Sequence, residues 1–399
     1  MEFQKIKLHR SEKNRAAVTQ ITLDDDYNVP DYRQDIVKVI KERGELRFDE
    51  VKAMEGAAWI KGSLVFKVLY RSDKQEGKIS CLRGEIPFQE RLNMDGLSEY
   101  DAVHATGDME DLTIGVINSR KLNVRAVIVL TASSEKEVDE ELTCELSDGS
   151  SYEQNIVEKE ALKLLVVRRD ICRQKSEAVL PSSKPNIREI LWQSMQLRNV
   201  ESRLVEGNIR LSGEILVSIL YNDEEEGEHL SWYETTVPLD AQAECGVMED
   251  DCIWQVQMVP LTMELEVKPD YDGEERILVM ELALDTHIRI WKEEKIRLLT
   301  DLYSLQKEVK PVFRECPLER LLVKNAAKCR MTEQMELKED KEKVLQICSC
   351  EGKVLLERQE IKTDGVLAEG TVEVNILYIT PDDHMPVGAV QEIYPFSQL

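Results

Sequence analysis

The chain has 399 residues, of which 42% are hydrophobic and 32% are charged, so it is long enough for two or three domains with apolar cores. Its 52 basic and 77 acidic side chains give a formal net charge of −25, which argues against a nucleic-acid backbone or an anionic membrane surface as the partner. No stretch approaches the ~20 apolar residues of a membrane-spanning helix, and the first residues lack the apolar core of a signal peptide.

Three segments of the chain share one pattern and align without gaps. Each begins with a glycine and ends with a tyrosine eight residues later, and a proline followed by a large apolar residue comes 17 residues after the tyrosine. The periods of 151 and 157 residues are domain-sized, so the pattern predicts tandem copies of one domain. The recurring positions, which we interpret as structural, are Gly62, Tyr70 and Pro87, then Gly213, Tyr221 and Pro238, then Gly370, Tyr378 and Pro395.

Each repeated segment alternates with a period of two, which predicts a half-buried strand. A polar stretch then leads to the proline, so the strand, the turn and a returning strand predict a hairpin. The proline fits the end of the returning strand or a sheet edge, where no backbone donor is needed. In the first copy the predicted inner face has Leu64, Phe66, Val68 and Tyr70, and the other face has Ser63, Val65, Lys67 and Leu69.

Further elements are predicted around these hairpins. Single helical turns are expected at Pro30–Ile36 and Pro185–Ile190, because proline is favoured at the first position of a helix. Alternation predicts strands at Lys121–Leu130 and Arg276–Trp291. Asn155–Leu165 fits either a short helix or the beginning of a strand. The chain is therefore predicted to be mainly β with a few short helices, and the pattern leaves a sandwich and a barrel both open.

Domain boundaries follow from the repeat. We expect a first copy at residues 1–150, a second at 151–311 and a third at 312–399. The polar stretch Ser133–Tyr152 is the predicted linker between the first two. The third copy ends four residues after its proline, so it is expected to be truncated at about its midpoint.

Two short motifs suggest chemistry, and each has a simpler interpretation. Asp270–Glu275 resembles part of a calcium loop but lacks its third acidic ligand and its distant glutamate, so a hairpin turn is favoured. Asp285 and His287 form the one arrangement that suggests catalysis among five scattered histidines. Both lie on one face of a predicted strand, so a solvated face with a cross-strand ion pair is favoured.

The cysteines and tryptophans give weaker signals. The nine cysteines form no C-x-x-C pair, which is typical of a reduced, cytoplasmic protein. Cys348 and Cys350 are predicted on one strand face, where they could bind a metal but more simply serve as small apolar residues. The five tryptophans occupy different repeat positions, so core and hairpin roles are favoured over a sugar-stacking platform.

The chain shows no known catalytic or cofactor-binding motif. It has no Walker loop, no dinucleotide fingerprint, no G-x-S-x-G and no H-E-x-x-H. We therefore predict that it is not an enzyme and that it has no catalytic residues, no cofactor and no metal site. Tandem copies of a non-catalytic β domain indicate binding or assembly.

The repeated pattern G-x-Φ-x-V-x-I-L-Y, a polar turn and then Φ-P-F, where Φ is apolar, resembles the SPOCS domain of spore-forming Firmicutes. Pro185–Ile190, Glu206–Gly213 and Asp301–Ser304 resemble other segments of that family. The resemblance covers essentially the whole chain, and the second copy is the best match.

The resemblance implies a non-enzymatic cytoplasmic scaffold for spore envelope or coat assembly. It would act in the mother cell at the forespore surface and bind a SpoIVA-like morphogenetic ATPase of the coat basement. Nucleic acid binding and direct membrane insertion are not expected, and self-association is left open. Multi-copy members of this type also have a C-terminal LysM domain, which these 399 residues do not show. The alternative is a carbohydrate- or cell-envelope-binding β-repeat protein, against which the missing signal peptide counts.

Overall fold

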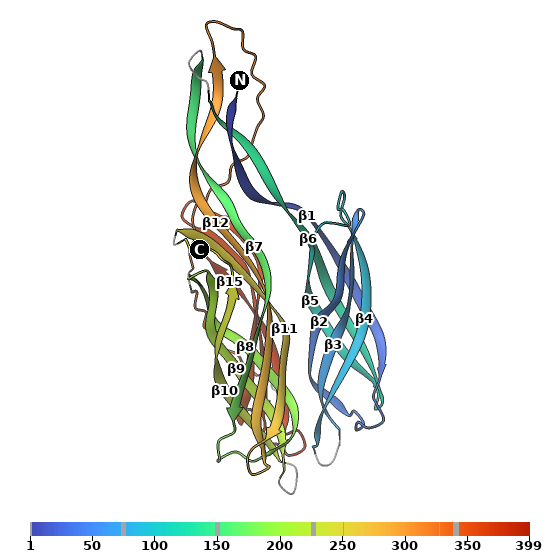
Figure 1. Cartoon of the computed structure of the whole chain (residues 1–399). Coiled ribbons are helices and arrows are strands. Elements are labelled where there is room, and N and C mark those ends of the chain that lie inside the picture. Colours follow the sequence, from blue (N-terminus) through green and yellow to red (C-terminus); the bar gives the residue numbers. More distant parts are fainter. Residues whose placement is uncertain are drawn as a thin grey trace.

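The computed structural model describes residues 2–72, 77–147, 152–224, 229–249, 251–326, 328–337 and 343–399. All fifteen regular elements in these residues are β-strands, which confirms the prediction of a mainly β chain. Figure 1 shows two large lobes, a stalk that rises above one of them, and a smaller third sheet.

The first repeat forms two three-stranded antiparallel sheets. The order of the first is β2-β3-β4, and that of the second is β1-β6-β5. Phe66 of β3 and Ile128 of β6 are fully buried in the core that the two sheets share, so the sheets pack face to face. The strands are β1 (Phe3–Asn28), β2 (Lys38–Met54), β3 (Ala57–Arg71), β4 (Ile79–Asn93), β5 (Val103–Asn118) and β6 (Lys121–Leu146).

The second repeat has the same arrangement. Its sheets have the orders β10-β9-β8 and β11-β12-β7, and Ile219 of β9 packs with Leu284 of β12 in one core. Each of the first two repeats is therefore a sandwich, which is one of the two architectures that the sequence left undecided. The strands are β7 (Glu153–Val179), β8 (Ile187–Val205), β9 (Asn208–Asp223), β10 (Leu230–Glu244), β11 (Cys252–Pro269) and β12 (Glu275–Tyr303).

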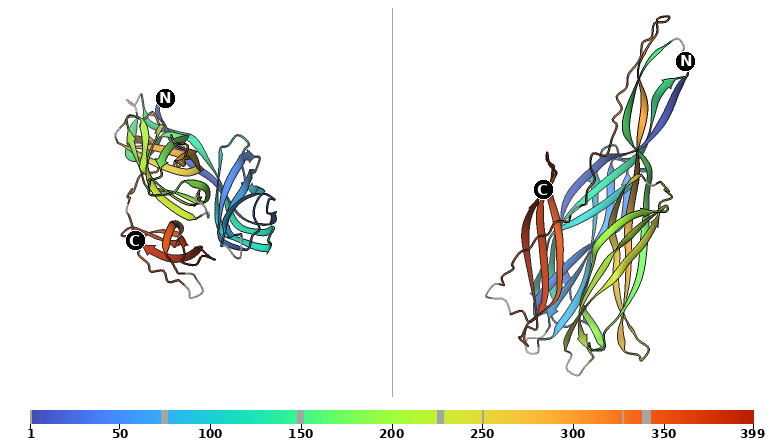
Figure 2. Two further views of the ribbon diagram at one scale, coloured as in Figure 1. Left: turned by 90° about the horizontal axis from the view of Figure 1, so that it is seen from below. Right: turned by 90° about the vertical axis from the view of Figure 1, so that its left-hand side faces the viewer.

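The third repeat contributes one sheet with the order β13-β14-β15. Its strands are β13 (Gln346–Ile361), β14 (Val366–Ile379) and β15 (Val387–Gln398). Figure 2 shows this sheet, in red, beside the two larger lobes. The described residues between β12 and β13 form no strand.

The central hairpin strands differ from the prediction in one respect. Alternation predicted a half-buried strand, but both faces of β3 and β9 are mostly buried. Leu64 and Leu69 lie on opposite faces of β3, and neither is exposed. The second face is buried because another repeat covers it, which alternation within one strand does not encode. The polar turns of the first two hairpins include residues 73–76 and 225–228, which lie outside the described residues.

The stalk replaces the predicted linker. The first half of β1 pairs with the end of β6, and the first half of β7 pairs with the end of β12. The linker assignment at Ser133–Tyr152 is therefore wrong as far as Leu146, because these polar residues continue β6; residues 148–151 lie outside the described residues. A small apolar cluster holds the four strands together and contains Leu8, Leu142, Ala161 and Ile296.

The predicted helical turns are also wrong. The amide of Arg33 donates to the carbonyl of Pro30 at 2.9 Å in an isolated turn, and β8 already begins at Ile187. The φ of proline is compatible with a turn and with an extended chain as well as with the first turn of a helix, so the local signal does not separate them. Residues 155–165 lie in β7, the strand alternative. Among the described residues, no helix has the length and apolar character to cross a bilayer.

Candidate functional site

The repeat glycines lie opposite irregularities of the neighbouring strand. Each is in the central strand, beside a β-bulge in β2, β8 or β13. A Cβ on Gly62 would lie 2.4 Å from the carbonyl oxygen of Arg47, and one on Gly370 would lie 2.1 Å from that of Leu355. Glycine at these positions therefore lets the bulged backbone approach closely.

The repeat tyrosines are buried at the far end of the same strands. The hydroxyl groups of Tyr70 and Tyr221 donate to the carbonyls of Gln34 and Pro185, each at 3.1 Å. Burial raises the pKa of Tyr221 to about 12. Tyr378 is 1% exposed. The contacts of Tyr70 and Tyr221 tie the loop before each of the first two hairpins to its central strand.

The repeat prolines lie within the edge strands β4, β10 and β15, opposite residues of the central strand. All three are exposed, as expected for a residue that cannot donate a ladder hydrogen bond. At Pro238 the carbonyl accepts from the side chain of Gln174 at 2.7 Å, and the oxygen of this side chain accepts from the amide of Asp240 at 2.9 Å. The edge of β10 is thereby held against β7.

The three hairpin sheets, β2-β3-β4, β8-β9-β10 and β13-β14-β15, pack on one another along a buried seam. Leu69, Leu220 and Leu377 occupy the same repeat position and meet in this seam, each at 1% exposure or less. Seen from below, the three bodies are grouped around one centre (Figure 2, left). The buried seam residues are Leu69, Ile79, Leu191, Trp192, Leu220, Cys348, Leu377 and Val387.

A buried lysine lies at the polar edge of this seam. The Nζ atom of Lys41 is 5.5 Å from the centre of the Trp192 ring and 4.0 Å from Oε1 of Glu351, and Arg43 Nη1 lies 3.7 Å from the same oxygen. Burial lowers the pKa of Lys41, and the charge of Glu351 opposes this effect. One group from each repeat thus meets at this point.

The predicted catalytic pair lies in a contact between the first two repeats. Asp285 is bound by Arg169 through two hydrogen bonds of 2.8 and 2.6 Å, so the expected ion pair exists, but the carboxylate is only 7% exposed. The ring of His287 packs edge-on against His104 of β5 at 4.7 Å, and Arg289 binds Glu135 of β6. The interpretation as a solvated face is wrong because the first repeat covers it.

The electrostatics of this contact favour a structural role. Burial opposes ionisation of Asp285, but the hydrogen bonds and charge of Arg169 outweigh it and lower the pKa of the carboxyl. Burial and the neighbouring His287 lower the pKa of His104. The carboxylate of Asp285 therefore binds the guanidinium of Arg169 in a bidentate geometry, and this pair links β7 to β12.

The two cysteines of β13 do not share an environment. A β-bulge between Ile347 and Ser349 changes the alternation, so Cys348 is 2% exposed in the seam whereas Cys350 is exposed. Burial raises the pKa of Cys348 to about 12. In the part of the chain that the structure describes, no three His, Cys, Asp or Glu side chains gather as metal ligands.

The calcium-like motif forms the turn between β11 and β12. Oδ1 of Asp270 accepts from the amides of Asp272 and Glu274 at 2.9 and 3.1 Å, and Gly273 has a φ of 85°. The carboxylate thus closes the turn itself, as an Asx turn does. The structure therefore confirms that this motif is a hairpin turn.

The five tryptophans form no exposed platform. Trp192 is buried, and Trp59, Trp232, Trp254 and Trp291 are half-buried. The indole N–H of Trp254 donates to Ser202 at 3.3 Å, and Lys324 lies 4.5 Å above its ring. Sugar stacking needs an accessible ring face, which this arrangement does not offer.

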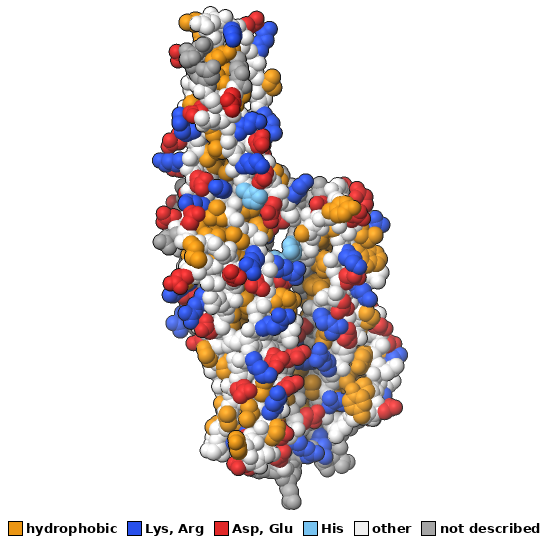
Figure 3. Space-filling model, in the orientation of Figure 1, with side chains coloured by type: hydrophobic (Ala, Val, Ile, Leu, Met, Phe, Trp, Pro, Cys, Tyr) orange, Lys and Arg blue, Asp and Glu red, His pale blue; other side chains and the backbone are white. Residues whose placement is uncertain are grey.

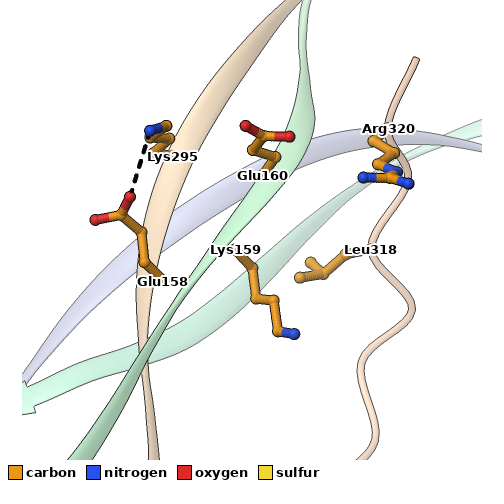
Figure 4. Close-up of a pocket in the computed structure, with 6 residues that line it drawn as sticks. All are labelled: Glu158, Lys159, Glu160, Lys295, Leu318 and Arg320. Carbon is orange, nitrogen blue, oxygen red and sulfur yellow. Dashed lines mark ion pairs between the residues drawn. The ribbon is translucent and has the colours of Figure 1, made fainter. Parts of the chain in front are cut away.

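One hollow of about 480 Å³ lies on the stalk (Figure 4). It is bordered by β7, β12 and the segment that follows β12, and Lys295 pairs with Glu158 across it at 3.6 Å. Ligand sites for small molecules are mostly apolar, whereas this hollow is lined by charges of both signs. The lining residues are Glu158, Lys159, Glu160, Lys295, Leu318 and Arg320.

The most distinctive surface is the outer face of the third sheet, which we call the open face. Val354 is 64% exposed and Leu356 48%, although their repeat equivalents, Leu46 and Phe48, pack into the core of the first repeat. These side chains are accessible because no second sheet packs on this one among the described residues. The larger aliphatic side chains that β13 and β14 contribute to the open face are Ile347, Val354, Leu356, Ile361, Val366, Val372, Val374 and Ile376.

Charged side chains cover much of the remaining surface. On the face shown in Figure 3, basic and acidic groups are interspersed over both lobes and the stalk. The third copy was predicted to be truncated at about its midpoint, but the exposure of this face was not predicted. The alternation of Val372, Val374 and Ile376 could have identified this face, because these residues match positions that are buried in the first repeat.

Two stretches of the chain, residues 35–117 and 343–399, match the family model described as SipL, SPOCS domain. The first stretch spans β2, β3, β4 and most of β5, and the second spans the third sheet. The second repeat is related to both by the recurring glycine, tyrosine and proline. No curated protein and no solved structure matches the chain.

Proposed function

Since this chain belongs to the SPOCS-domain family, we propose that it is a non-enzymatic scaffold for assembly of the spore envelope or coat. The family makes it a sporulation-related protein. The scaffold role is our proposal, and the observation that carries it is the buried seam, which packs the hairpin sheets of three copies of one β domain together in a chain whose sequence has no known catalytic motif.

The proposed partner is a SpoIVA-like morphogenetic ATPase at the forespore surface, in the cytoplasm of the mother cell. The formal charge of −25 would accelerate encounter with a basic patch on such a partner. The buried seam between the repeats supports the role, because it keeps the three hairpin sheets in contact with one another.

A localisation experiment tests this proposal. A fluorescent fusion of the chain should form a ring around the forespore in sporulating cells, and the ring should be lost when the ATPase is deleted. The ATPase should also co-purify with the chain from sporulating cells. A diffuse signal in the presence of the ATPase, or a ring that persists without it, would contradict the proposed partner.

The alternative of carbohydrate or cell-envelope binding has less support. Exposed tryptophans in a groove would favour it, but all five are buried or half-buried. Binding of the purified chain to peptidoglycan fragments, measured by calorimetry, would revive this alternative.

A further inference from the structure

Two histidines of different repeats meet where the sheet β1-β6-β5 touches the sheet β11-β12-β7. The rings of His104 in β5 and His287 in β12 lie edge to face, with their centres 4.7 Å apart. The side chain of His287 is 18% exposed, and His104 is half-buried. Histidine is the side chain whose charge ordinarily changes between pH 5 and pH 8, so this contact is able to respond to protons.

Charged side chains of three strands surround the two rings. Asp285 of β12 accepts two hydrogen bonds from Arg169 of β7. Glu135 of β6 accepts from Nε of Arg289 in β12 at 3.0 and 3.1 Å. The two carboxylates and the two guanidinium groups balance while both rings are neutral. Each proton that a ring takes up therefore adds an unbalanced positive charge to the contact.

A second proton is less favourable at this contact than a first. Oδ2 of Asp285 lies 3.4 Å from Nε2 of His287, so a proton on this ring faces a carboxylate. His104 would then face a charged ring. Burial lowers the pKa of His104, and the charges of His287 and Arg169 lower it further. Asp285 and Glu135 oppose this effect on the pKa without reversing it.

The contact between these two sheets is polar. The hydrophobic clusters of the described residues lie inside one of the first two repeats, in the stalk or in the seam. Glu135 of the first repeat and Arg289 of the second form an ion pair across the contact, and their side chains are 13% and 14% exposed. The two histidines and this ion pair hold the sheets together here, so added charge weakens the contact.

We propose that His104 and His287 form a proton-sensitive latch between the first two repeats. The latch is closed while both rings are neutral. It opens when both carry a proton, because two imidazolium rings this close repel each other and the two guanidinium groups beside them. The seam and the stalk still join the repeats, so opening exposes the outer faces of β5 and β12 without separating the lobes.

The direction of the pH dependence follows from the lowered pKa of His104. The ordinary value is 6.5, so the open form takes up this proton at a higher pH than the closed form does. The closed latch therefore has its full stability above pH 6.5 and loses it as the pH falls below this value. Between the two pKa values, each pH unit favours opening by up to about tenfold.

The stalk contains a histidine with the opposite behaviour. The hydrogen bond with Asp139 raises the pKa of His9. The contribution of His9 to stability is therefore fully present below pH 6.5 and is lost as the pH rises through the higher folded value. A melting temperature of the whole chain mixes the two effects, so the latch needs a local measurement.

Hydroxyl-radical labelling of the full chain, read by mass spectrometry at pH 7.5 and pH 5.5, gives this measurement. Because His287 is 18% exposed while the latch is closed, full opening should raise its labelling about fivefold at pH 5.5. His229 is exposed in the second repeat, so its labelling corrects for the intrinsic effect of pH on a histidine ring. Phe66 is fully buried in the core of the first repeat, and it should stay unlabelled while the fold is intact.

Two variants of His104 separate protonation from packing. His104→Phe keeps a ring against His287 but takes up no proton, so labelling of His287 should be the same at both pH values. His104→Arg carries a permanent charge, so its His287 should be labelled at pH 7.5 as strongly as that of the wild type at pH 5.5. The matched control is His384→Phe, which changes an exposed histidine of the third repeat and should keep the wild-type rise.

Three results would each overturn the latch. The first is equal labelling of His287 at the two pH values in the wild type. The second is a rise that persists in His104→Phe, and the third is wild-type labelling of His287 in His104→Arg at pH 7.5. If labelling of Phe66 shows that one variant is unfolded, the wild-type comparison and the other variant decide.

Discussion

The ammonium nitrogen of Lys41 lies 5.5 Å from the centre of the Trp192 ring, and the two residues occupy the same position in successive repeats. The equivalent residue of the third repeat is Ser349, which is 3% exposed. Equivalent positions of three repeats therefore face one another, as they would around a threefold axis. Because the side chains differ, each repeat contributes a different chemical group to a common contact.

Substitution of Lys41 by methionine should stabilise the protein near pH 7. The buried ammonium carries a desolvation penalty, and Glu351 keeps Arg43 as a partner, so we expect a gain of about 1 kcal/mol. Burial lowers the pKa of Lys41 below its ordinary 10.5, so the folded protein loses this proton before the unfolded chain does. The wild type therefore gains stability as the pH rises between the two values, and the advantage of Lys41→Met should shrink.

Urea denaturation of both proteins between pH 7 and pH 10 measures this advantage. Lys61→Met removes an exposed lysine of the neighbouring strand β3 and serves as the control. A difference between Lys41→Met and the wild type that stays constant over this range would contradict the prediction.

Truncation of Leu377 should loosen the third sheet. Its side chain is fully buried in the seam, and Leu→Ala at such sites costs ~2–5 kcal/mol. Leu356→Ala makes the same change on the opposite face of the sheet, where the side chain is 48% exposed, and should cost less than ~1 kcal/mol. Limited proteolysis should cut the third sheet of Leu377→Ala faster than that of Leu356→Ala, and equal rates would exclude the seam as its anchor.

Neutralisation of Asp285 should destabilise the contact between β7 and β12. The buried carboxylate accepts two hydrogen bonds from Arg169, so Asp285→Asn should cost ~1–3 kcal/mol at pH 7. Arg169 lowers the pKa of Asp285 below its ordinary 3.8, so this stability is present above that pH and is lost as the pH falls through the folded value. The gap between variant and wild type should therefore close below about pH 4.

Thermal denaturation between pH 3 and pH 7 gives the comparison. Glu281→Gln removes a partner of Lys175 from an exposed pair on the same two strands, and it should change the stability little. If Asp285→Asn has no larger effect than this control at pH 7, the pair does not stabilise the fold.

Gly370→Ala tests the close approach at the bulges. The new Cβ would lie 2.1 Å from the carbonyl oxygen of Leu355, and relief of such a clash by backbone shifts costs about 1–3 kcal/mol. Gly352→Ala lies in the same sheet with no atom within 4 Å of the new Cβ, and it should be close to neutral. Denaturant unfolding compares the two, and similar midpoints would show that the bulged backbone has room for a side chain.

Much of the local structure could be predicted from the sequence. The alternation around Tyr70, Tyr221 and Tyr378 identified the central strands, and the recurring prolines placed the returning strands beside them. The helical turns after Pro30 and Pro185 were wrong: a turn follows Pro30 and a strand follows Pro185, and the φ that proline imposes is compatible with both as well as with a helix. Asp285 and His287, which suggested catalysis, could be interpreted only from the structure, because strands of the first repeat cover them.

The sequence by itself determined that the chain is a tandem array of one β unit, because alternation and spacing are properties of neighbouring residues. The tertiary structure decided which faces are covered. Leu69, Leu220 and Leu377 meet although more than 150 residues separate each from the next, and no local pattern encodes that contact. It likewise decided that Val354 is exposed while Leu46 is partly buried against the core of the first repeat, because burial of a sheet face depends on the sheet that packs against it.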